Sequence, residues 1–436
     1  MNRPMLLSAA LTLMIAGSSH GQAPTALSPE AQKLAEQVRQ THDKVTAEVA
    51  DVEMHAKAEA MIAKAAAFLR SRQDKATGGW STPKPDADGK SPPVFPAITG
   101  LVLMGLLDDP TTDARNEAAV QMGVKFLLNH QQPDGGIYDK VLPCYNTALA
   151  VSALSRVHTP QAREAAQRGV MFLKSLQWSE VADGKTGGAE APKPVQRDHP
   201  FYGGVGYGRH SRPDNSNLAM FMQALEDAGV SPQDEAVKRA LVFLRRTQMD
   251  DRVNPEKYAK GSRQGGFVYS TVENAESVES RPGQSEAGVI EETLSDGTVA
   301  SRLRAYGSMT YAGFKSLIYA ELPKHDQRVA AAMGWIRRNY TVDENPGIGA
   351  AGQYYYYLTF SRALRAWGEP TIKTLSATGE PSGAPGERNW RADLVNKLAG
   401  LQSEDGSFKS VGKRWMEDNP DLITAYALEA LCEAMR

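Results

Sequence analysis

A repeat that occurs six times is the feature of this 436-residue sequence that most restricts its fold. Each copy has an apolar pair, three further residues and then a glutamine, and most copies continue into a glycine-rich turn and an aromatic residue. The first copy is Phe68-Leu69 with Gln73, followed by Gly78-Gly79-Trp80. Repeats of this length predict stacked helical or strand units that bury a core between neighbours. The other copies are Phe126-Leu127 with Gln131 and Tyr138, Phe172-Leu173 with Gln177, Phe243-Leu244 with Gln248 and Phe267, Trp335-Ile336 with Tyr340 in place of glutamine, and Leu398 with Gln402 and Phe408.

A second helix-like segment follows each copy. The first helix of each pair is amphipathic, which suits an outer helix with one wet face. The second is apolar nearly all round, as expected of a buried helix. Six such pairs bury their apolar surface by closing into an all-α, six-fold α/α toroid, a double-walled helical barrel, whereas an open solenoid would need polar caps. The expected inner helices cover residues 95–107, 144–157, 214–229, 308–322, 353–367 and 421–435.

The N-terminus has the pattern of a secretory signal peptide. Arg3 precedes the apolar stretch Met5 to Ile15, and small residues lead to a cleavage site after Ala23. This stretch is too short for a permanent spanning helix, so we expect a periplasmic or secreted protein that is not integral to the membrane, with an uncleaved anchor as the alternative. The expected domains are a signal peptide (1–23), an N-terminal helical extension (24–59) and the toroid (60–435), with insertions at 180–213, 250–305 and 370–386.

Charge and cysteine content exclude some classes of protein. The chain has 49 basic and 51 acidic residues, and it lacks the basic excess typical of nucleic-acid binders. Its two cysteines, Cys144 and Cys432, fall on repeats that are not adjacent, so we expect two buried free thiols rather than a disulfide.

The repeat resembles the QW motif of squalene-hopene cyclases and oxidosqualene cyclases, and the resemblance covers residues 60–435. Protein prenyltransferase β subunits use a similar helical toroid. The resemblance implies a central cavity that receives an isoprenoid. We interpret the repeated glutamines as caps for the ends of the outer helices, with the aromatic residues packing on the turns.

Class II terpene cyclases protonate an alkene with the middle Asp of a DxDD motif. The best match is Asp214-Asn215-Ser216-Asn217, which has Ser216 at the acid position. A hydroxyl cannot protonate an alkene near neutral pH, so cyclisation by this mechanism is not expected, and Asp214 is a helix cap or a ligand contact. The zinc site of prenyltransferases is also missing, because no Asp-x-Cys pair or His stands near Cys144 or Asp421. No metal or cofactor is expected.

Aromatic clusters near the starts of the inner helices are the other candidates. One or two residues of Tyr354-Tyr355-Tyr356-Tyr357 should face the cavity, and core packing is the alternative for each. The glycine-rich segment from Asp198 and His199 to His210 contains Phe201, Tyr202 and Tyr207 and is expected to form a mobile aromatic loop at a cavity mouth. Its Asp and His residues are expected to make hydrogen bonds within the loop, with a metal site as the alternative. The ligand-binding candidates are Tyr145, Asn146, Tyr207, Asp214, Asn217, Tyr311, Tyr354, Tyr355 and Asp421, and the weak catalytic candidates are Asp214, Asp421, Asp198 and Asp418.

Three functions remain open. The first is an exported protein that binds an isoprenoid or other apolar ligand without the cyclase acid. The second is an enzyme, either a terpene cyclase or mutase with a displaced acid or a glycan-active enzyme. The third is a scaffold for protein interactions. An apolar pocket favours the first function, paired carboxylates in an open groove favour the second, and a filled centre favours the third.

Overall fold

The computed structural model describes residues 29–84, 91–181, 192–208, 211–273, 282–375, 386–410 and 412–436. The expected signal peptide and its cleavage site lie outside these ranges. The chain divides into two units, Met1–Glu53 and Met54–Arg436. No helix within the described residues is long and apolar enough to cross a membrane.

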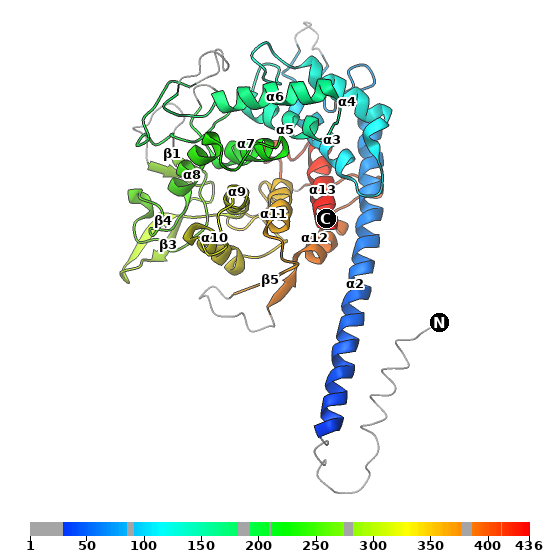
Figure 1. Cartoon of the computed structure of the whole chain (residues 1–436), viewed down its shortest axis with the longest axis vertical. Coiled ribbons are helices and arrows are strands. Elements are labelled where there is room, and N and C mark those ends of the chain that lie inside the picture. Colours follow the sequence, from blue (N-terminus) through cyan, green and yellow to red (C-terminus); the bar gives the residue numbers. More distant parts are fainter. Residues whose placement is uncertain are drawn as a thin grey trace. The chain divides into compact units, whose positions relative to one another are not determined.

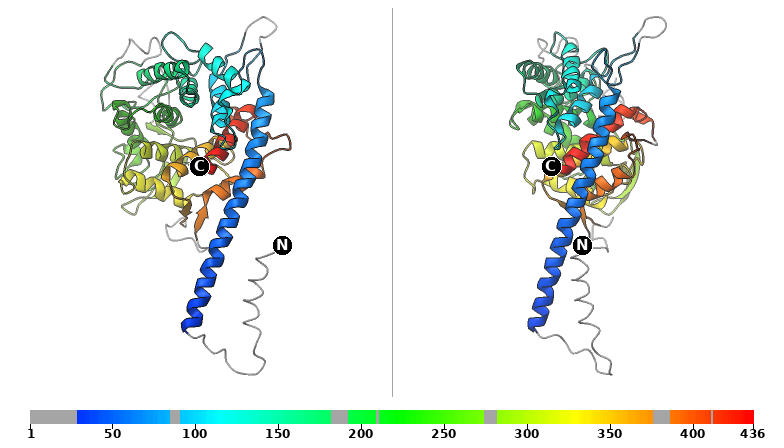
Figure 2. Two further views of the ribbon diagram at one scale, coloured as in Figure 1. Left: turned by 45° about the vertical axis from the view of Figure 1, so that its right-hand side comes forward. Right: turned by 90° about the vertical axis from the view of Figure 1, so that its right-hand side faces the viewer.

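One continuous helix, α2 (Pro29–Arg72), contributes to both units (Figure 2). Its start agrees with the sequence, because Ser28-Pro29-Glu30 places a proline in the first helical turn. In the first unit the helix has mostly exposed side chains, whereas in the second unit its residues Met54, Ala58, Ile62, Ala65 and Leu69 are buried. The second part of α2 therefore supplies an apolar face to the core.

In the described part of the second unit, six apolar helices form the centre, and each contacts the next along the chain (Figure 1). The last of them also contacts the first, so these contacts close into a ring. Each of these helices starts within two residues of the expected position. Nearly every side chain in them is buried, as the all-round apolar pattern predicts. These inner helices are α3 (Pro96–Asp108), α5 (Pro143–Ser155), α7 (Asn215–Asp227), α9 (Gly307–Tyr319), α11 (Gln353–Trp367) and α13 (Pro420–Met435).

The outer helices each bury one face. In α8 the buried residues Ala236, Val237, Ala240, Phe243 and Leu244 follow the spacing of a single helical stripe, while the remaining positions include its charged side chains. In α4, α6 and α8 the Phe-Leu pair of the repeat therefore belongs to the buried stripe. The outer helices after α2 are α4 (Ala118–Asn129), α6 (Pro160–Ser175), α8 (Glu235–Thr247), α10 (Gln327–Arg338) and α12 (Trp390–Ala399).

The repeated glutamine joins neighbouring repeats. Gln248 donates hydrogen bonds from Nε2 to the carbonyl of Gly265 in its own turn, at 2.9 Å, and to that of Arg328 in the next outer helix, at 2.8 Å. The interpretation of the glutamine as a cap for its own helix is therefore wrong, since its amide bridges two repeats. The same pair of bonds is made by Gln73 to Gly78 and Ala119, Gln131 to Gly135 and Ala165, Gln177 to Gly203 and Ala236, and Gln402 to Gly406 and Met61.

The fifth repeat makes this connection with a different residue. Tyr340 stands where the other repeats have glutamine, and its hydroxyl donates to Asp393 Oδ2 in α12 at 2.8 Å. The bond from Gln402 to Met61 links the sixth repeat to the first. Every junction between neighbouring outer helices in the described chain thus has a side-chain hydrogen bond at the repeat position.

The glycine of each turn lies against the next outer helix. Gly203 has φ +84°, and a Cβ there would be 1.9 Å from the carbonyl oxygen of Arg239. Because Gln177 bonds to Gly203, this glycine belongs to the turn of the third repeat, although it lies 26 residues after the glutamine and was not predicted from the sequence. Phe201 and Tyr202 before it are buried, so the expected aromatic loop at the cavity mouth is wrong for these two residues.

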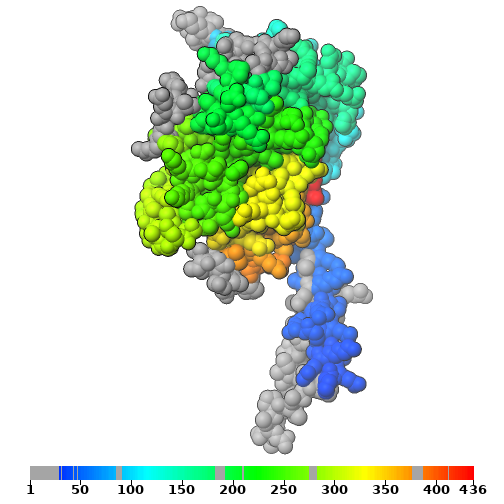
Figure 3. Space-filling view, turned by 60° about the vertical axis from the view of Figure 1, so that its left-hand side comes forward, coloured from blue at the N-terminus to red at the C-terminus, as the bar shows by residue number. Residues whose placement is uncertain are grey.

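Short strands occur in and beside the insertions 250–305 and 370–386, for which the sequence predicts no regular structure. The insertion 250–305 contains two antiparallel pairs, and β3 and β4 form a largely exposed hairpin at the yellow-green margin in Figure 3. Cys144 and Cys432 are both buried and free, as predicted. The strands are β1 (Ser270–Val272), β2 (Pro282–Gln284), β3 (Val289–Thr293), β4 (Val299–Leu303), β5 (Thr371–Lys373) and β6 (Glu387–Asn389), and the short 3₁₀ helices are η1 (Ala114–Asn116), η3 (Lys257–Ala259) and η4 (Arg414–Met416).

Candidate ligand-binding cavity

A cavity of about 210 Å³ lies where the N-terminal ends of the inner helices converge. All of these helices contribute a residue from their first two turns, or the residue just before them. The lining residues from the helices and their immediate starts are Phe95, Ala97, Ile98, Leu142, Tyr145, Ser216, Tyr306, Ser308, Met309, Gly352, Tyr355, Leu422 and Tyr426. Loops add Tyr207, Tyr269, Trp415, Met416 and Glu417.

Tyrosine side chains dominate this lining, and several of their hydroxyls are already paired. The hydroxyl oxygens of Tyr145 and Tyr426 are 2.8 Å apart. Ser216 Oγ donates to the hydroxyl of Tyr355 at 3.1 Å, and the rings of Tyr355 and Tyr426 meet edge to face, with centroids 6.1 Å apart. Burial raises the pKa of these tyrosines, so they are neutral near pH 7. The paired hydroxyls leave mainly aromatic surface facing the space.

Glu417 is the charged residue among the lining side chains, and it is 1% exposed. Its Oε1 accepts hydrogen bonds from the backbone N–H groups of Tyr354 at 2.8 Å and Tyr355 at 3.2 Å, and its Oε2 accepts one from Gln353 at 3.0 Å. A carboxylate at a helix N-terminus satisfies free donors and offsets the helix dipole. Burial raises the pKa of Glu417 against the opposing effect of these bonds.

The loop that carries Glu417 has an unusual backbone. Trp415 and Met416 both have positive φ, 56° and 64°, which costs of order 1 kcal/mol or more for each non-glycine residue. Trp415 is 44% exposed, and its ring lies against Gly352 at the start of α11. Arg414 stacks on Trp415 at 4.2 Å and forms an ion pair with Glu286. These contacts hold the loop at the edge of the cavity.

Asp214 lies behind the cavity wall. It caps α7 by accepting hydrogen bonds from the Asn217 backbone N–H at 2.8 Å and from the Asn217 side chain at 2.9 Å. Burial raises the pKa of Asp214 to about 6, against the lowering effect of these bonds and of Arg212. Its side chain is 2% exposed and is not part of the lining, so it acts on the cavity through its field.

The structure places three of the predicted ligand-binding residues, Tyr145, Tyr207 and Tyr355, in the cavity lining. Tyr311 instead packs against Tyr356 and Phe360 in the core, and the hydroxyl of Tyr354 donates to the carbonyl of Lys409. Helix geometry explains the outcome, because neighbouring side chains point about 100° apart and only one of four consecutive tyrosines reaches the cavity.

The polar candidates have structural contacts away from the cavity. Asn146 Oδ1 accepts the Ala97 backbone N–H at 2.9 Å, and Asn217 is bonded to Asp214. Asp421 is 1% exposed and is held by Arg72 at 2.9 Å and Ser81 at 2.7 Å. None of these three lines the cavity, so the prediction that they contact a ligand there is not supported.

The remaining acidic candidates lie at the surface. Asp198 and Asp418 are exposed, and Asp198 lines a separate open pocket with His199. The His199 ring stacks on Trp178, and its Nδ1 accepts the Phe201 backbone N–H at 3.1 Å. His210 lies outside the described residues. No group of three potential metal ligands occurs among the residues that the structure describes.

The aromatic and charged lining residues that were not predicted from the sequence include Tyr269, Tyr306, Trp415, Glu417 and Tyr426. Tyr306 immediately precedes α9, and Tyr426 lies two turns into α13, so the rule of searching inner-helix starts could have found them. Tyr269, Trp415 and Glu417 come from loops, where no local pattern indicates which way a side chain points.

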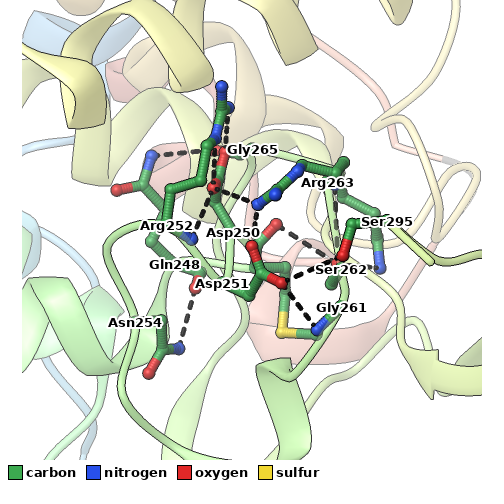
Figure 4. A network of polar contacts seen from close by, with 12 residues as sticks. Gln248, Asp250, Asp251, Arg252, Asn254, Gly261, Ser262, Arg263, Gly265 and Ser295 are labelled. Atoms are coloured by element: carbon green, nitrogen blue, oxygen red, sulfur yellow. Dashed lines mark hydrogen bonds and ion pairs between the residues drawn. The ribbon is translucent and has the colours of Figure 1, made fainter.

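Two charged networks lie outside the cavity. In the 250–305 insertion, Asp250 and Asp251 pair with Arg252 and Arg263 (Figure 4), so the network neutralises itself. The second network lies at the opposite ends of the inner helices. There Arg156 pairs with Asp108 at 2.9 Å and Asp227 at 3.1 Å. The burial of these charges is compensated by their pairing, which indicates a structural role.

No protein-family model matches the sequence, and no curated protein matches it either. A type II terpene cyclase from Scytonema, solved with geranylgeranyl dihydroxybenzoate, is similar at 14% identity and a TM-score of 0.49, covering 88% of this chain and 99% of that one. An α-1,6-mannanase of Salegentibacter with bound mannotriose is similar at 11% identity and a TM-score of 0.46, covering 86% and 99%.

A D-mannose isomerase is similar at 12% identity and a TM-score of 0.42, covering 87% of this chain and 96% of that one. These three proteins have different activities. At these identities and scores they assign none of those activities to this chain.

Proposed function

We propose that this chain is an exported six-fold α/α toroid of the squalene-cyclase-like type that binds an isoprenoid or other apolar molecule in the tyrosine-lined cavity. The closed ring of contacts among the inner helices supports the toroid. The cavity itself is the observation that carries the function, because apolar and aromatic walls with few polar groups are typical of small-molecule sites. Its volume of about 210 Å³ suits a short isoprenoid or one end of a longer one.

The chemistry of the lining favours binding over cyclisation. Ser216 occupies the position of the cyclase acid, and its hydroxyl donates to Tyr355. Glu417 is the lining carboxyl group, but both of its oxygens accept backbone hydrogen bonds. These bonds occupy both oxygens and favour the ionised form, against the effect of burial, which raises the pKa of Glu417. Protonation of an alkene requires a positioned acid, and Asp214 is bonded to Asn217 behind the wall.

The two other candidate functions, a glycan-active enzyme and a protein-interaction scaffold, lack matching features in the cavity. A glycosidase needs a pair of carboxyl groups about 5–10 Å apart on either side of the substrate, whereas Glu417 alone supplies a carboxyl group to this lining. A pure scaffold would have a filled centre, yet an open space remains at the inner-helix starts. Binding of a small molecule therefore accounts for more of the described structure than either alternative.

Farnesol titration into the purified mature chain tests this proposal, with Trp415 fluorescence as the signal because its ring borders the cavity. We expect saturable binding, and we expect Met309→Trp to abolish it by filling the space. Thermal unfolding of the empty variant shows whether it remains folded. Absence of binding to the wild type, together with an absence of co-purifying lipid by mass spectrometry, would overturn the proposal.

Export is tested separately by fractionation of expressing cells. A periplasmic or secreted chain that begins at about Pro24, measured by intact mass, supports cleavage after Ala23. A cytoplasmic chain that retains its first residues would contradict export, and a membrane-bound chain of full length would support the uncleaved anchor.

A further inference from the structure

The cavity lining has an asymmetric charge. Glu417 contributes a carboxyl group whose oxygens accept three backbone hydrogen bonds, and no Lys, Arg or His is among the described lining residues. Arg414 lies at the edge, where its charge is paired with Glu286. Arg212 stacks on Tyr269 at 5.3 Å, but its Nη1 donates to the carbonyls of Val272 and Glu273. Both of these cations are thus engaged in other contacts.

The aromatic surface is the second element. The cavity is bordered by the rings of Tyr145, Tyr207, Tyr269, Tyr306, Tyr355, Tyr426, Trp415 and Phe95. The faces of such rings carry negative potential and attract cations within about 6 Å, most strongly where water is excluded. Because the hydroxyls of Tyr145, Tyr355 and Tyr426 already bond to partners within the wall, these three residues present mainly their ring faces to a ligand. A cation without N–H groups can bind to these ring faces without losing any hydrogen bonds.

The converging helix N-termini could instead attract an anion, but their donors are occupied. Proline takes the first helical position of α3, α5 and α13 and removes one N–H group from each. Asp214 caps α7, Glu417 caps α11, and Asn345 Oδ1 accepts the Ser308 N–H of α9 at 2.9 Å. The carboxylates also offset the helix dipoles. An anionic head group would therefore meet the Glu417 carboxyl group and few free donors.

We propose that the ligand of this cavity carries a quaternary ammonium group, enclosed by the tyrosine rings and balanced by Glu417. The inference rests on the proposed function, in that this cavity binds a small molecule, and it adds the charge of that molecule.

Choline and its uncharged isostere 3,3-dimethylbutan-1-ol test this inference, because they differ mainly in the charge of the head group. Both are titrated into the mature chain by calorimetry, with farnesol in parallel. We expect choline to bind at least about tenfold more tightly than the alcohol, the ratio for a desolvated cation–π site. Equal affinities, or no binding of choline, overturn the inference. Farnesol binding in the same preparation then shows whether the proposed function survives.

Matched variants separate the roles of ring and charge. Tyr426→Leu removes a ring from the lining, whereas Tyr311→Leu removes a buried inner-helix ring that does not line it. We expect only the first to weaken choline binding, by about fivefold or more, since one aromatic contact is lost. Tyr426→Phe keeps the ring face and should bind choline within about twofold of the wild type. Glu417→Gln should lower the preference for choline over the alcohol, and an unchanged preference would contradict the role of its charge.

Discussion

Tyr145 and Tyr426 are 281 residues apart in sequence, yet their hydroxyl oxygens lie 2.8 Å from each other in the cavity wall. Tyr145 belongs to the first turn of α5 and Tyr426 to the second turn of α13. The helix between them in the ring of contacts is α3, whose Ala97 and Ile98 also line the cavity. This hydroxyl pair therefore links the second repeat to the last and depends on the ring being closed.

A double-mutant cycle on Tyr145→Phe and Tyr426→Phe measures this link. Each substitution removes one hydroxyl and leaves the other without its partner. We expect each single variant to lower the free energy of unfolding by about 1 kcal/mol and the pair to show a coupling of about 0.5–1.5 kcal/mol. Urea unfolding of the four proteins provides the values. Strictly additive losses would show that the two hydroxyls do not interact.

Gly203→Ala tests the packing of the third repeat turn. The added methyl group would overlap the Arg239 carbonyl, 1.9 Å away, so the backbone of α8 or of the turn must move. We expect a loss of more than about 3 kcal/mol, the range of severe local strain. Gly229→Ala is the matched control, because Gly229 also has positive φ, +72°, but nothing lies within 4 Å. It should cost only about 1 kcal/mol, and equal losses would contradict the role of the contact.

Gln248→Ala tests the bridging role of the repeated glutamine. The substitution leaves the carbonyls of Gly265 and Arg328 without this donor in a buried position. We expect the free energy of unfolding to fall by about 2–4 kcal/mol, since each unsatisfied group costs about 1–3 kcal/mol. Tyr340→Phe removes a single bond to Asp393 and should cost about 1 kcal/mol. A loss below about 0.5 kcal/mol for Gln248→Ala would show that the amide contributes little.

Asp214 gives the wild type a defined dependence of stability on pH. Its folded-state pKa, about 6, is higher than its ordinary value of 3.8, so the folded chain holds this proton more tightly than the unfolded chain. Its contribution to stability is complete below about pH 4 and is lost as the pH rises through about 6. We therefore expect the stability of the wild type relative to Asp214→Asn to fall by up to about 3 kcal/mol between pH 4 and pH 7.

Urea unfolding of both proteins across this range measures the difference, in which the other titrating groups largely cancel. A constant difference would mean that Asp214 has the same pKa in both states. If the wild type instead became more stable relative to Asp214→Asn as the pH rises, the folded state would favour the carboxylate.

The sequence by itself determined where the helices are. The spacing of the Phe-Leu pairs predicted the outer helices, and the all-round apolar segments predicted α3, α5, α7, α9, α11 and α13, because helical periodicity and burial are local properties. The same pattern located the cavity region at the inner-helix starts and identified Tyr145 and Tyr355, whereas Tyr207 was predicted from the glycine-rich segment before α7.

Only the tertiary structure decided which of the candidates share the cavity. Tyr354 and Tyr355 are neighbours with the same chemistry, but the rotation of α11 against α9 and α13 turns one into the core and the other into the lining. Glu417 lies 64 residues from Gln353, and nothing in its own segment indicates that it caps α11. Local sequence fixes helix formation through short-range hydrogen bonds and apolar spacing, whereas the direction of a side chain depends on packing between segments that are distant in the chain.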